Sequence, residues 1–321
     1  MKKALLAGLL AALSGSVTAQ GTYPARTLTL VVGFAPGGGT DTVARVMQKR
    51  LAEDLGQSIV VANRAGAGGT LAADVVARAA PDGYTILLAT IAALAVAPHL
   101  NSKLPYNPLR DFTPISMATV SGNVLVVHSS VRAASIAEFV KEANRLPGGI
   151  AYGTSGVGSA GHLAGELFRL ISKANLTHVP YKGGGPAMGD LLGGQIQSVF
   201  ASATTATPQV KAGKLSALGT TGSKRSASLP EVPTIAEQGY PGYEATNWYA
   251  YVAPARTPAG IIARLNAAIV ATLREPATHA AILKLGEEPT PSTPEELARH
   301  IEREHATWGR VIKEAGIPPE Q

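Results

Sequence analysis

The sequence predicts an α/β protein of two lobes, each a mostly parallel sheet flanked by helices, with two chain crossings between them. Three observations predict this fold. Short apolar segments alternate with helical segments along most of the chain. Both halves place a glycine-rich turn between a strand and a helix. Finally, residues 222–243, rich in Pro, Gly and Ser, have the composition of a return crossing.

The composition supports a globular protein with many short elements. The chain has 321 residues, of which 45% are hydrophobic and 16% charged, so a substantial core is available. Aromatic residues are scarce (5%), while the 35 Gly and 22 Pro favour tight turns over a coiled coil or helical bundle. The formal net charge is +6, but no dense Lys/Arg run with aromatic residues is present. This pattern indicates a mildly basic surface and no nucleic-acid partner.

The N-terminus has the pattern of a secretory signal peptide, residues 1–19. Lys2 and Lys3 precede the apolar segment 4–13, and small residues ending at Ala19 form the expected cleavage site. That segment is too short for a membrane span, which needs roughly 20 residues. Cleavage leaves 26 basic and 22 acidic residues, a net charge of +4. The chain has no cysteine, so neither disulfides nor a lipid-carrying cysteine are expected, and a soluble periplasmic protein is predicted.

The first group of elements has a βαβαβ rhythm, which predicts a parallel sheet with right-handed connections. The expected strands are 27–32, 58–62 and 84–89, with helices from Asp41 to Gly56 and from the 66–69 turn through Ala80. The apolar stretch 86–97 is also too short to span a membrane and ends at Pro98, so it is expected in the core.

A second rhythm begins after the Pro-punctuated stretch 104–114. The expected strands are 124–127, 150–152, 177–179, 198–201 and 215–218, with helices after the glycine turns. The last third is helical: apolar residues recur at helical spacing from Ile261 to Leu273, and a capping box at Thr293 opens a helix to Gly316. Lobe 1 is therefore expected to comprise 22–122 plus 223–321, and lobe 2 residues 123–222, with closure on a ligand between them.

The first glycine turn, residues 33–41, ends at a helix N-terminus, where free N–H groups and the helix dipole favour an anion. Gly37, Gly38 and Gly39 allow the backbone to approach a ligand closely. Thr40 offers a hydroxyl. Asp41 either caps the helix or contacts the ligand, and capping is the favoured role.

The second turn contains Gly156-x-Gly158-x-x-Gly161, which matches the dinucleotide-binding fingerprint in form. The acidic residue expected about 20 positions later is missing, because the next strand ends at Tyr181-Lys182. A hydrolase elbow is also unsupported, since Val157 occupies the outer glycine position. The turn instead predicts a carboxylate cradle of backbone N–H groups and hydroxyls, the latter from Thr154, Ser155 and Ser159.

Other polar and aromatic residues leave alternatives open. His162 has either a functional role, in which it contacts an anion or acts as a base, or a structural role in packing or capping. The structural role is favoured. Lys182 is either solvated or tunes the cleft electrostatically. Trp248 and Tyr249 are expected in the core rather than in a ligand wall. The remaining histidines do not form H-E-x-x-H, so no metal site or cofactor is predicted.

Short motifs in order along nearly the whole mature chain carry a resemblance to a known family. They are 33–38 (GFAPGG), 81–85 (PDGYT), 104–108 with 111–112 (LPYNP, DF), 152–163, 178–183 (HVPYKG), 190–195, 211–215 (KAGKL), 229–234 (LPEVPT) and 253–258. On these residues the chain resembles the periplasmic solute receptors of tripartite tricarboxylate transporters, also called Bordetella uptake gene (Bug) receptors.

The resemblance implies a Venus-flytrap, or periplasmic-binding-protein, fold that holds a small carboxylate in the cleft. It implies a monomer without catalysis that delivers its ligand to membrane transporter subunits. The two turns, 35–41 and 153–159, are expected to hold the carboxylate. The expected ligand-binding residues are Ala35, Gly37, Gly38, Gly39, Thr40, Asp41, Thr90, Gly153, Thr154, Ser155, Gly158, Ser159, His162, Lys182 and Ser202.

One departure from the family pattern bears on the ligand. The family often has an acidic or amide pair after the position of Phe200, whereas this chain has Ala201-Ser202. A ligand with an amino group at its far end is therefore not favoured. A ligand whose far end is small or apolar is favoured.

Bulky replacements at Gly38 or Gly158 are expected to abolish binding and leave the fold intact. The alternatives are an exported enzyme acting through Ser159 or His162, and a ligand sensor for a signalling partner.

Overall fold

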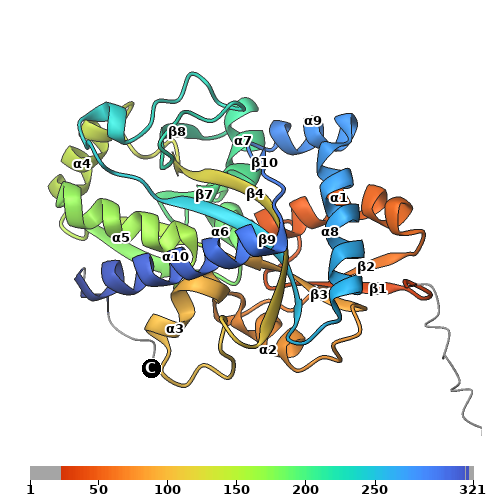
Figure 1. Ribbon diagram of the computed structural model, residues 1–321. Coiled ribbons are helices and arrows are strands. Elements are labelled where there is room, and N and C mark those ends of the chain that lie inside the picture. Colours follow the sequence, from red (N-terminus) through yellow and green to blue (C-terminus); the bar gives the residue numbers. More distant parts are fainter. Residues whose placement is uncertain (1–22, 315, 318–321) are drawn as a thin grey trace, which may run out of the picture.

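A computed structural model describes residues 23–314, 316 and 317, so the predicted signal peptide lies outside the described residues. Figure 1 shows two lobes joined by long strands, with helices on the outer faces of each. The strands are β1 (Leu28–Val32), β2 (Ile59–Asn63), β3 (Thr85–Thr90), β4 (Phe112–Val127), β5 (Ile150–Thr154), β6 (Leu176–Pro180), β7 (Ser198–Ser202), β8 (Ser216–Thr220), β9 (Thr246–Pro254) and β10 (Glu288–Pro289). The helices are α1 (Gly39–Leu55), η2 (Ala67–Gly69), α2 (Thr70–Ala77), η3 (Ala92–Val96), α3 (Ala97–Leu100), α4 (Ile136–Arg145), α5 (Ala160–Ser172), α6 (Gly184–Leu192), α7 (Ala203–Lys211), η4 (Ala236–Gln238), α8 (Ala259–Arg274), α9 (Pro276–Lys284) and α10 (Pro294–Glu314).

Lobe 1 is built on the sheet β2-β1-β3-β9-β4, with β10 also paired to β4. The pairs of β1 with β2 and β3 are parallel, and β9 is antiparallel to both β3 and β4. Helices α1 and α8 bury apolar residues such as Met47 and Leu265 against one face. Helices α2 and α10 and the π-helical turn η3 cover the other, where Leu297 and Trp308 are buried. The alternation of strands and helices thus produces the predicted three-layer lobe.

Lobe 2 repeats this arrangement on the order β4-β7-β5-β6, with β8 also paired to β4. The pairs of β5 with β6 and β7 are parallel. Helices α4 and α5 pack Phe139 and Phe168 on one face, and helices α6 and α7 pack Leu191 and Ala206 on the other. The structure confirms the predicted α/β fold of two sheets flanked by helices.

Strand β4 has 16 residues and belongs to both sheets, so it forms one of the two crossings. The chain returns beside it at Ala245. Thr221 ties the two crossings together. Its hydroxyl accepts from the Asn123 N–H at 2.8 Å and donates to the Ala245 carbonyl at 2.6 Å. Its backbone also bonds to the same two residues.

We expect Thr221→Val to lower the free energy of unfolding by about 2 kcal/mol, because it leaves a buried N–H and a buried carbonyl unpaired. Urea denaturation of the ligand-free protein measures this change. Thr220→Val is the matched control, since the Thr220 hydroxyl is buried without a hydrogen-bond partner among the described residues. Equal stability losses in the two variants would contradict this role of Thr221.

Several elements, helix α4 among them, differ from the prediction, and β4 and α7 show the reasons most clearly. Strand β4 begins at Phe112, well before the predicted start at Val124, because its first half pairs with β9 although Pro114 and polar residues interrupt its apolar pattern. Helix α7 had no counterpart in the prediction, since its sequence ATTATPQVK is rich in threonine and contains Pro208. Of the helices that the structure describes, none combines the length and apolar character that crossing a membrane requires.

Candidate functional site

The candidate site is a cavity between the two lobes, with about 390 Å³ of empty space including the part open to solvent. It is lined by Phe34, Gly39, Thr40, Thr90, Ala92, Asn123, Ser155, Ser159, Ala160, Gly161, Gly184, Ser202, Asn247 and Tyr249. Both sheets contribute, because β1 and β3 of lobe 1 end here and β9 begins here, while β5 and β7 of lobe 2 end here. Among the residues that the structure describes around this cavity, none has a charged side chain.

Four helices begin at the cavity wall. Gly39 opens α1, Ala160 opens α5, Gly184 opens α6, and Ser202 immediately precedes α7. In the described part of the chain, no side-chain cap takes the first N–H groups of α1, α6 or α7. Free N–H groups and the positive ends of four helix dipoles therefore surround a neutral cavity, an arrangement that attracts an anion.

Asp41 stabilises the first glycine turn from the side that faces away from the cavity. The Asp41 carboxylate accepts from the Gly37 N–H at 2.9 Å, from Arg45 Nε at 3.0 Å and from Asn63 Nδ2 at 2.9 Å. Asn63 also donates to the Phe34 carbonyl. Burial alone would raise the pKa of Asp41, but these hydrogen bonds outweigh it and hold the pKa below its ordinary value. The carboxylate therefore stays ionised and shapes the turn from outside the cavity.

The second turn has the same construction, with His162 in the place of Asp41. His162 Nδ1 accepts from the Gly158 N–H at 3.1 Å, four residues before it, just as Asp41 accepts from Gly37. The imidazole is buried and stacks on His178 with ring centroids 4.1 Å apart. Burial lowers the pKa of His162, which keeps Nδ1 free to accept. In each turn the third helical residue thus orients the glycine that precedes the helix cap.

The glycines of the Gly156-x-Gly158-x-x-Gly161 pattern have conformational and packing roles. Gly156 and Gly158 have φ of +130° and +70°, values that other residues rarely adopt. Gly161 lies against β7, where a Cβ atom would collide with the Phe200 carbonyl oxygen. The match to a dinucleotide fingerprint therefore reflects tight packing of a helix on a strand.

The lobes touch each other around the cavity. The Ala35 N–H donates to the Lys182 carbonyl at 3.3 Å, from the first turn of lobe 1 to lobe 2. A Cβ atom on Gly68 would lie 2.7 Å from the Val157 carbonyl oxygen across the cleft. The described conformation is therefore closed.

The structure places the sequence-predicted ligand residues in three positions. Those that line the cavity are Gly39, Thr40, Thr90, Ser155, Ser159 and Ser202. Those that lie behind or beside the two turns are Ala35, Gly37, Gly38, Asp41, Gly153, Thr154, Gly158 and His162. Lys182 is exposed and lines a neighbouring cavity together with Ser155 and Gly68.

Several lining residues were missed by sequence reasoning. Tyr249 was expected in the core; its ring is buried there, but its hydroxyl lines the cavity. Asn123 and Asn247 lie on the paired strands β4 and β9 at the crossing. Gly184 could have been predicted from the sequence, because it lies in a third glycine turn, immediately before a helix. Asn123 and Asn247 could not, because their place in the cavity depends on the pairing of distant strands.

Two buried polar atoms in the cavity wall lack a hydrogen-bond partner among the described residues: Thr90 Oγ1 and Asn123 Nδ2. Thr90 is 5% and Asn123 2% exposed. Buried donors are rarely left unpaired, so these atoms point to a polar ligand or water. Within the described residues, no group of three or more His, Cys, Asp or Glu lies together to hold a metal ion.

Comparisons with known proteins agree with this geometry. The family model described as "Tripartite tricarboxylate transporter family receptor" matches residues 43–317. Protein BugT of Bordetella pertussis is 40% identical over 296 residues, 92% of this chain and 91% of that protein. The solved structure of R. palustris Rpa4515 with adipate has a TM-score of 0.90 at 38% identity, covering 93% of this chain and all of that one. The structure of MatC from Rhodopseudomonas palustris with bound malate has a TM-score of 0.86 at 35% identity, covering 90% of this chain and all of that one. The chain therefore belongs to the family of tripartite tricarboxylate transporter receptors.

Proposed function

We propose that this protein is a periplasmic receptor that binds a small dicarboxylate between its lobes and delivers it to a tripartite membrane transporter. The observation that carries the proposal is the convergence of four helix N-termini on a cavity without charged side chains. Backbone N–H groups and dipoles offset the cost of removing an anion from water. The relatives solved with adipate and malate support the same ligand class.

One carboxylate of the ligand lies between the starts of α1 and α5 in this proposal. The lobes, residues 22–122 plus 223–321 and residues 123–222, close on it about the crossings. Asp41 and His162 are positioning residues that hold the two turns in shape. Thr90 and Asn123 supply the donors that lack partners among the described residues.

The far end of the ligand meets the start of α7. The Ser202 hydroxyl lies 2.8 Å from the Thr204 hydroxyl and 3.1 Å from that of Thr205. The sequence favoured a small or apolar far end, but this hydroxyl group at a helix N-terminus favours a hydrogen-bond acceptor. A second carboxylate or a hydroxyl meets that requirement, and an ammonium group does not.

A catalytic role for Ser159 and His162 does not fit this arrangement. The Ser159 hydroxyl accepts from the His162 backbone N–H, while the imidazole Nδ1 faces Gly158 and the ring stacks on His178. A serine nucleophile needs the imidazole itself as its base. We therefore expect malate or adipate to be recovered unchanged after incubation with the protein, and turnover would contradict the receptor proposal.

A thermal-shift screen of protein that has been unfolded and refolded to remove bound ligand tests the ligand class. A ligand at about 100 times its Kd adds roughly 2.7 kcal/mol of stability, so malate, adipate or succinate is expected to raise Tm by several degrees. Matched monocarboxylates are expected to shift Tm less. Strong shifts with aspartate or glutamate and none with plain dicarboxylates would overturn the proposed ligand class.

A further inference from the structure

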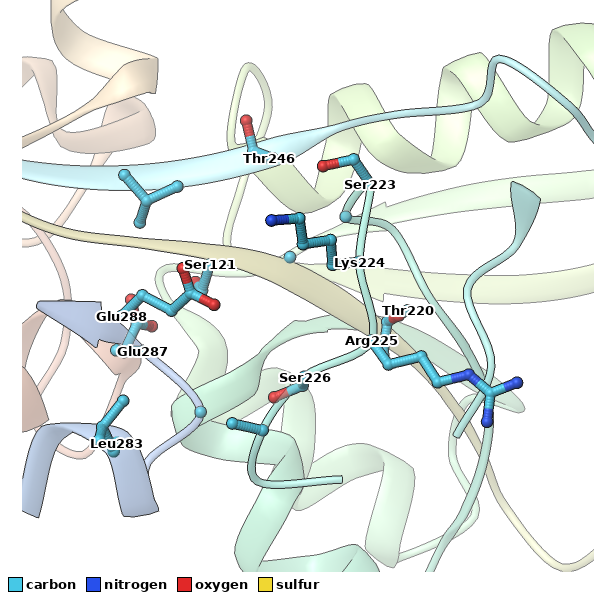
Figure 2. A pocket seen from close by; sticks show the side chains of 15 residues that line it. Ser121, Thr220, Ser223, Lys224, Arg225, Ser226, Thr246, Leu283, Glu287 and Glu288 are labelled. Carbon is cyan, nitrogen blue, oxygen red and sulfur yellow. The ribbon is translucent and has the colours of Figure 1, made fainter. Parts of the chain in front are cut away.

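Glu287 is a fully buried carboxyl at the hinge, outside the ligand cavity. It lines a second cavity between β4, β10 and the return segment 222–227. Its Oε2 accepts from the Thr119 hydroxyl at 2.8 Å, and its Oε1 has no hydrogen-bond partner among the described residues. Figure 2 shows Glu287 beside Glu288 on one side of this cavity, with Lys224 and Arg225 on the other.

The two cavities share the wall formed by β4 and β9. Thr119 stands opposite Tyr249 in the antiparallel pair, and Ser121 stands opposite Asn247. Directly opposed residues point to the same face of a sheet. Tyr249 and Asn247 line the ligand cavity, while Thr119 holds Glu287. Tyr249, which lines the ligand cavity, is therefore close enough to Glu287 that, besides burial, the carboxylate charge raises the pKa of its hydroxyl.

The adjoining glycine links Glu287 to the lobe that moves. Gly286 has φ of +81°, and a Cβ atom there would lie 2.7 Å from the Ala203 side chain, at the start of α7. Ala203 follows Ser202, which lines the ligand cavity. The environment of Glu287 is therefore completed by lobe 2 in the closed conformation.

The charged and titratable groups around Glu287 leave its negative charge uncompensated. Tyr249 faces it from β9, Glu288 adjoins it in β10, and Lys224 and Arg225 lie across the cavity. Arg225 pairs with Glu237, and both Lys224 and Glu288 are exposed. None of the ion pairs among the described residues includes Glu287. Burial raises the pKa of Glu287 to about 7, although the Thr119 and Ser121 hydroxyls oppose this shift.

We propose that Glu287 takes up a proton when the cleft closes on a carboxylate, so that ligand binding is coupled to protonation at the hinge. This inference rests on the proposed function, because it requires an anion in the cleft. An ionised Glu287 and a bound carboxylate repel each other across a buried layer that excludes water, and a proton on Glu287 removes that repulsion. Closure against α7 adds to the cost of an ionised carboxyl by excluding water.

The sign of the pH dependence follows from this coupling. Below the pKa of Glu287 the group is already neutral, so affinity is highest. As the pH rises through about 7, each binding event must recruit a proton, and affinity falls. For two unit charges separated by about 10 Å in a protein interior, the interaction corresponds to a change in affinity of about tenfold.

The test is calorimetric titration with malate and adipate between pH 6 and 8.5, where their carboxylates are ionised, in buffers of different ionisation enthalpy. We expect the wild type to bind about tenfold more weakly at pH 8.5 than at pH 6 and to take up a fraction of a proton near pH 7. Glu287→Gln, which is permanently neutral, is expected to bind at every pH as tightly as the wild type at pH 6. The exposed neighbour provides the control, Glu288→Gln, which is expected to titrate like the wild type.

The outcomes separate this inference from the receptor proposal. Binding whose pH dependence and proton uptake are the same in wild type and Glu287→Gln overturns the linkage alone. Failure of both dicarboxylates to bind at any pH overturns the receptor proposal and the linkage with it. A ligand-free readout adds a second check: the wild type is expected to lose stability relative to Glu287→Gln as the pH rises from about 4.5 towards 7, because the buried carboxyl of the folded protein keeps its proton to a higher pH than the unfolded chain does. A constant difference in Tm over this range contradicts a raised pKa at Glu287.

Discussion

Gly39→Val is expected to weaken dicarboxylate binding at least about 100-fold, because the new side chain enters the cavity at the point where its two walls meet. A Cβ atom on Gly39 would lie 2.5 Å from the Ser202 Oγ and 2.6 Å from the Tyr249 hydroxyl, and would also collide with the Thr204 hydroxyl. Ser202 and Thr204 belong to lobe 2, so opening the cleft relieves two of the three contacts. The substitution therefore acts on the closed, ligand-bound state.

Calorimetric titration measures this loss, and urea denaturation of the ligand-free protein measures its structural part. Gly189→Val is the matched control, because Gly189 lies in α6 with no atom within 4 Å of an added Cβ. Wild-type affinity in Gly39→Val would show that the ligand binds elsewhere. At Gly38 an added Cβ would meet the Ala35 carbonyl of its own turn at 3.2 Å, and Gly158 has φ of +70°. Substitutions there are expected to distort the turns as well as to impair binding.

Asp41→Ala is expected to lower the free energy of unfolding by about 3 kcal/mol and to reduce ligand affinity at least about tenfold. Asp41 is 2% exposed, and removing its carboxylate leaves the Gly37 N–H without its acceptor and the Asn63 amide without one of its two acceptors. The first turn then loses the contact that orients its N–H groups. Because the pKa of Asp41 is lower in the folded protein, its stabilisation is present at neutral pH and lost as the pH falls below about 3.8.

Urea denaturation at pH 7 and at about pH 3 tests this role, together with calorimetric titration at pH 7. Asp74→Ala provides the comparison, since Asp74 forms the same type of ion pair, with Arg78 four residues later, on the helix surface. Exposed pairs contribute little, so a loss below about 1 kcal/mol is expected there. Similar losses in the two variants would mean that Asp41 does no more than a surface ion pair.

The sequence was sufficient to predict the alternation of strands and helices and both glycine turns, because apolar periodicity and clustered glycines are local signals. It was insufficient for β4, since Phe112 to Asn123 becomes a strand only through its pairing with β9, more than a hundred positions later. The candidate site likewise contains some residues that local sequence patterns predict and others that they do not. Residues in the turns, such as Thr40 and Ser159, were predicted to face the ligand and line the cavity.

Residues contributed by tertiary pairing were not predictable. Asn123 and Asn247 reach the cavity because two strands cross there, and no local pattern marks that position. Asp41 and His162 were recognised as first-turn residues, but their shared role required coordinates, because only these show that each accepts from a glycine four positions earlier.

A binding site built from helix N-termini has a consequence for how such receptors diversify. Every residue except proline keeps its backbone N–H, so a side-chain substitution cannot by itself delete the N–H groups at Gly39, Ala160 and Gly184 that we propose bind the anion. Exchanges at Ser202 or Thr90 can alter which molecule fits while the anchor for its charge persists. Single exchanges at Ser202 or Thr90 are therefore expected to change the substrate without removing the backbone groups that hold its charge.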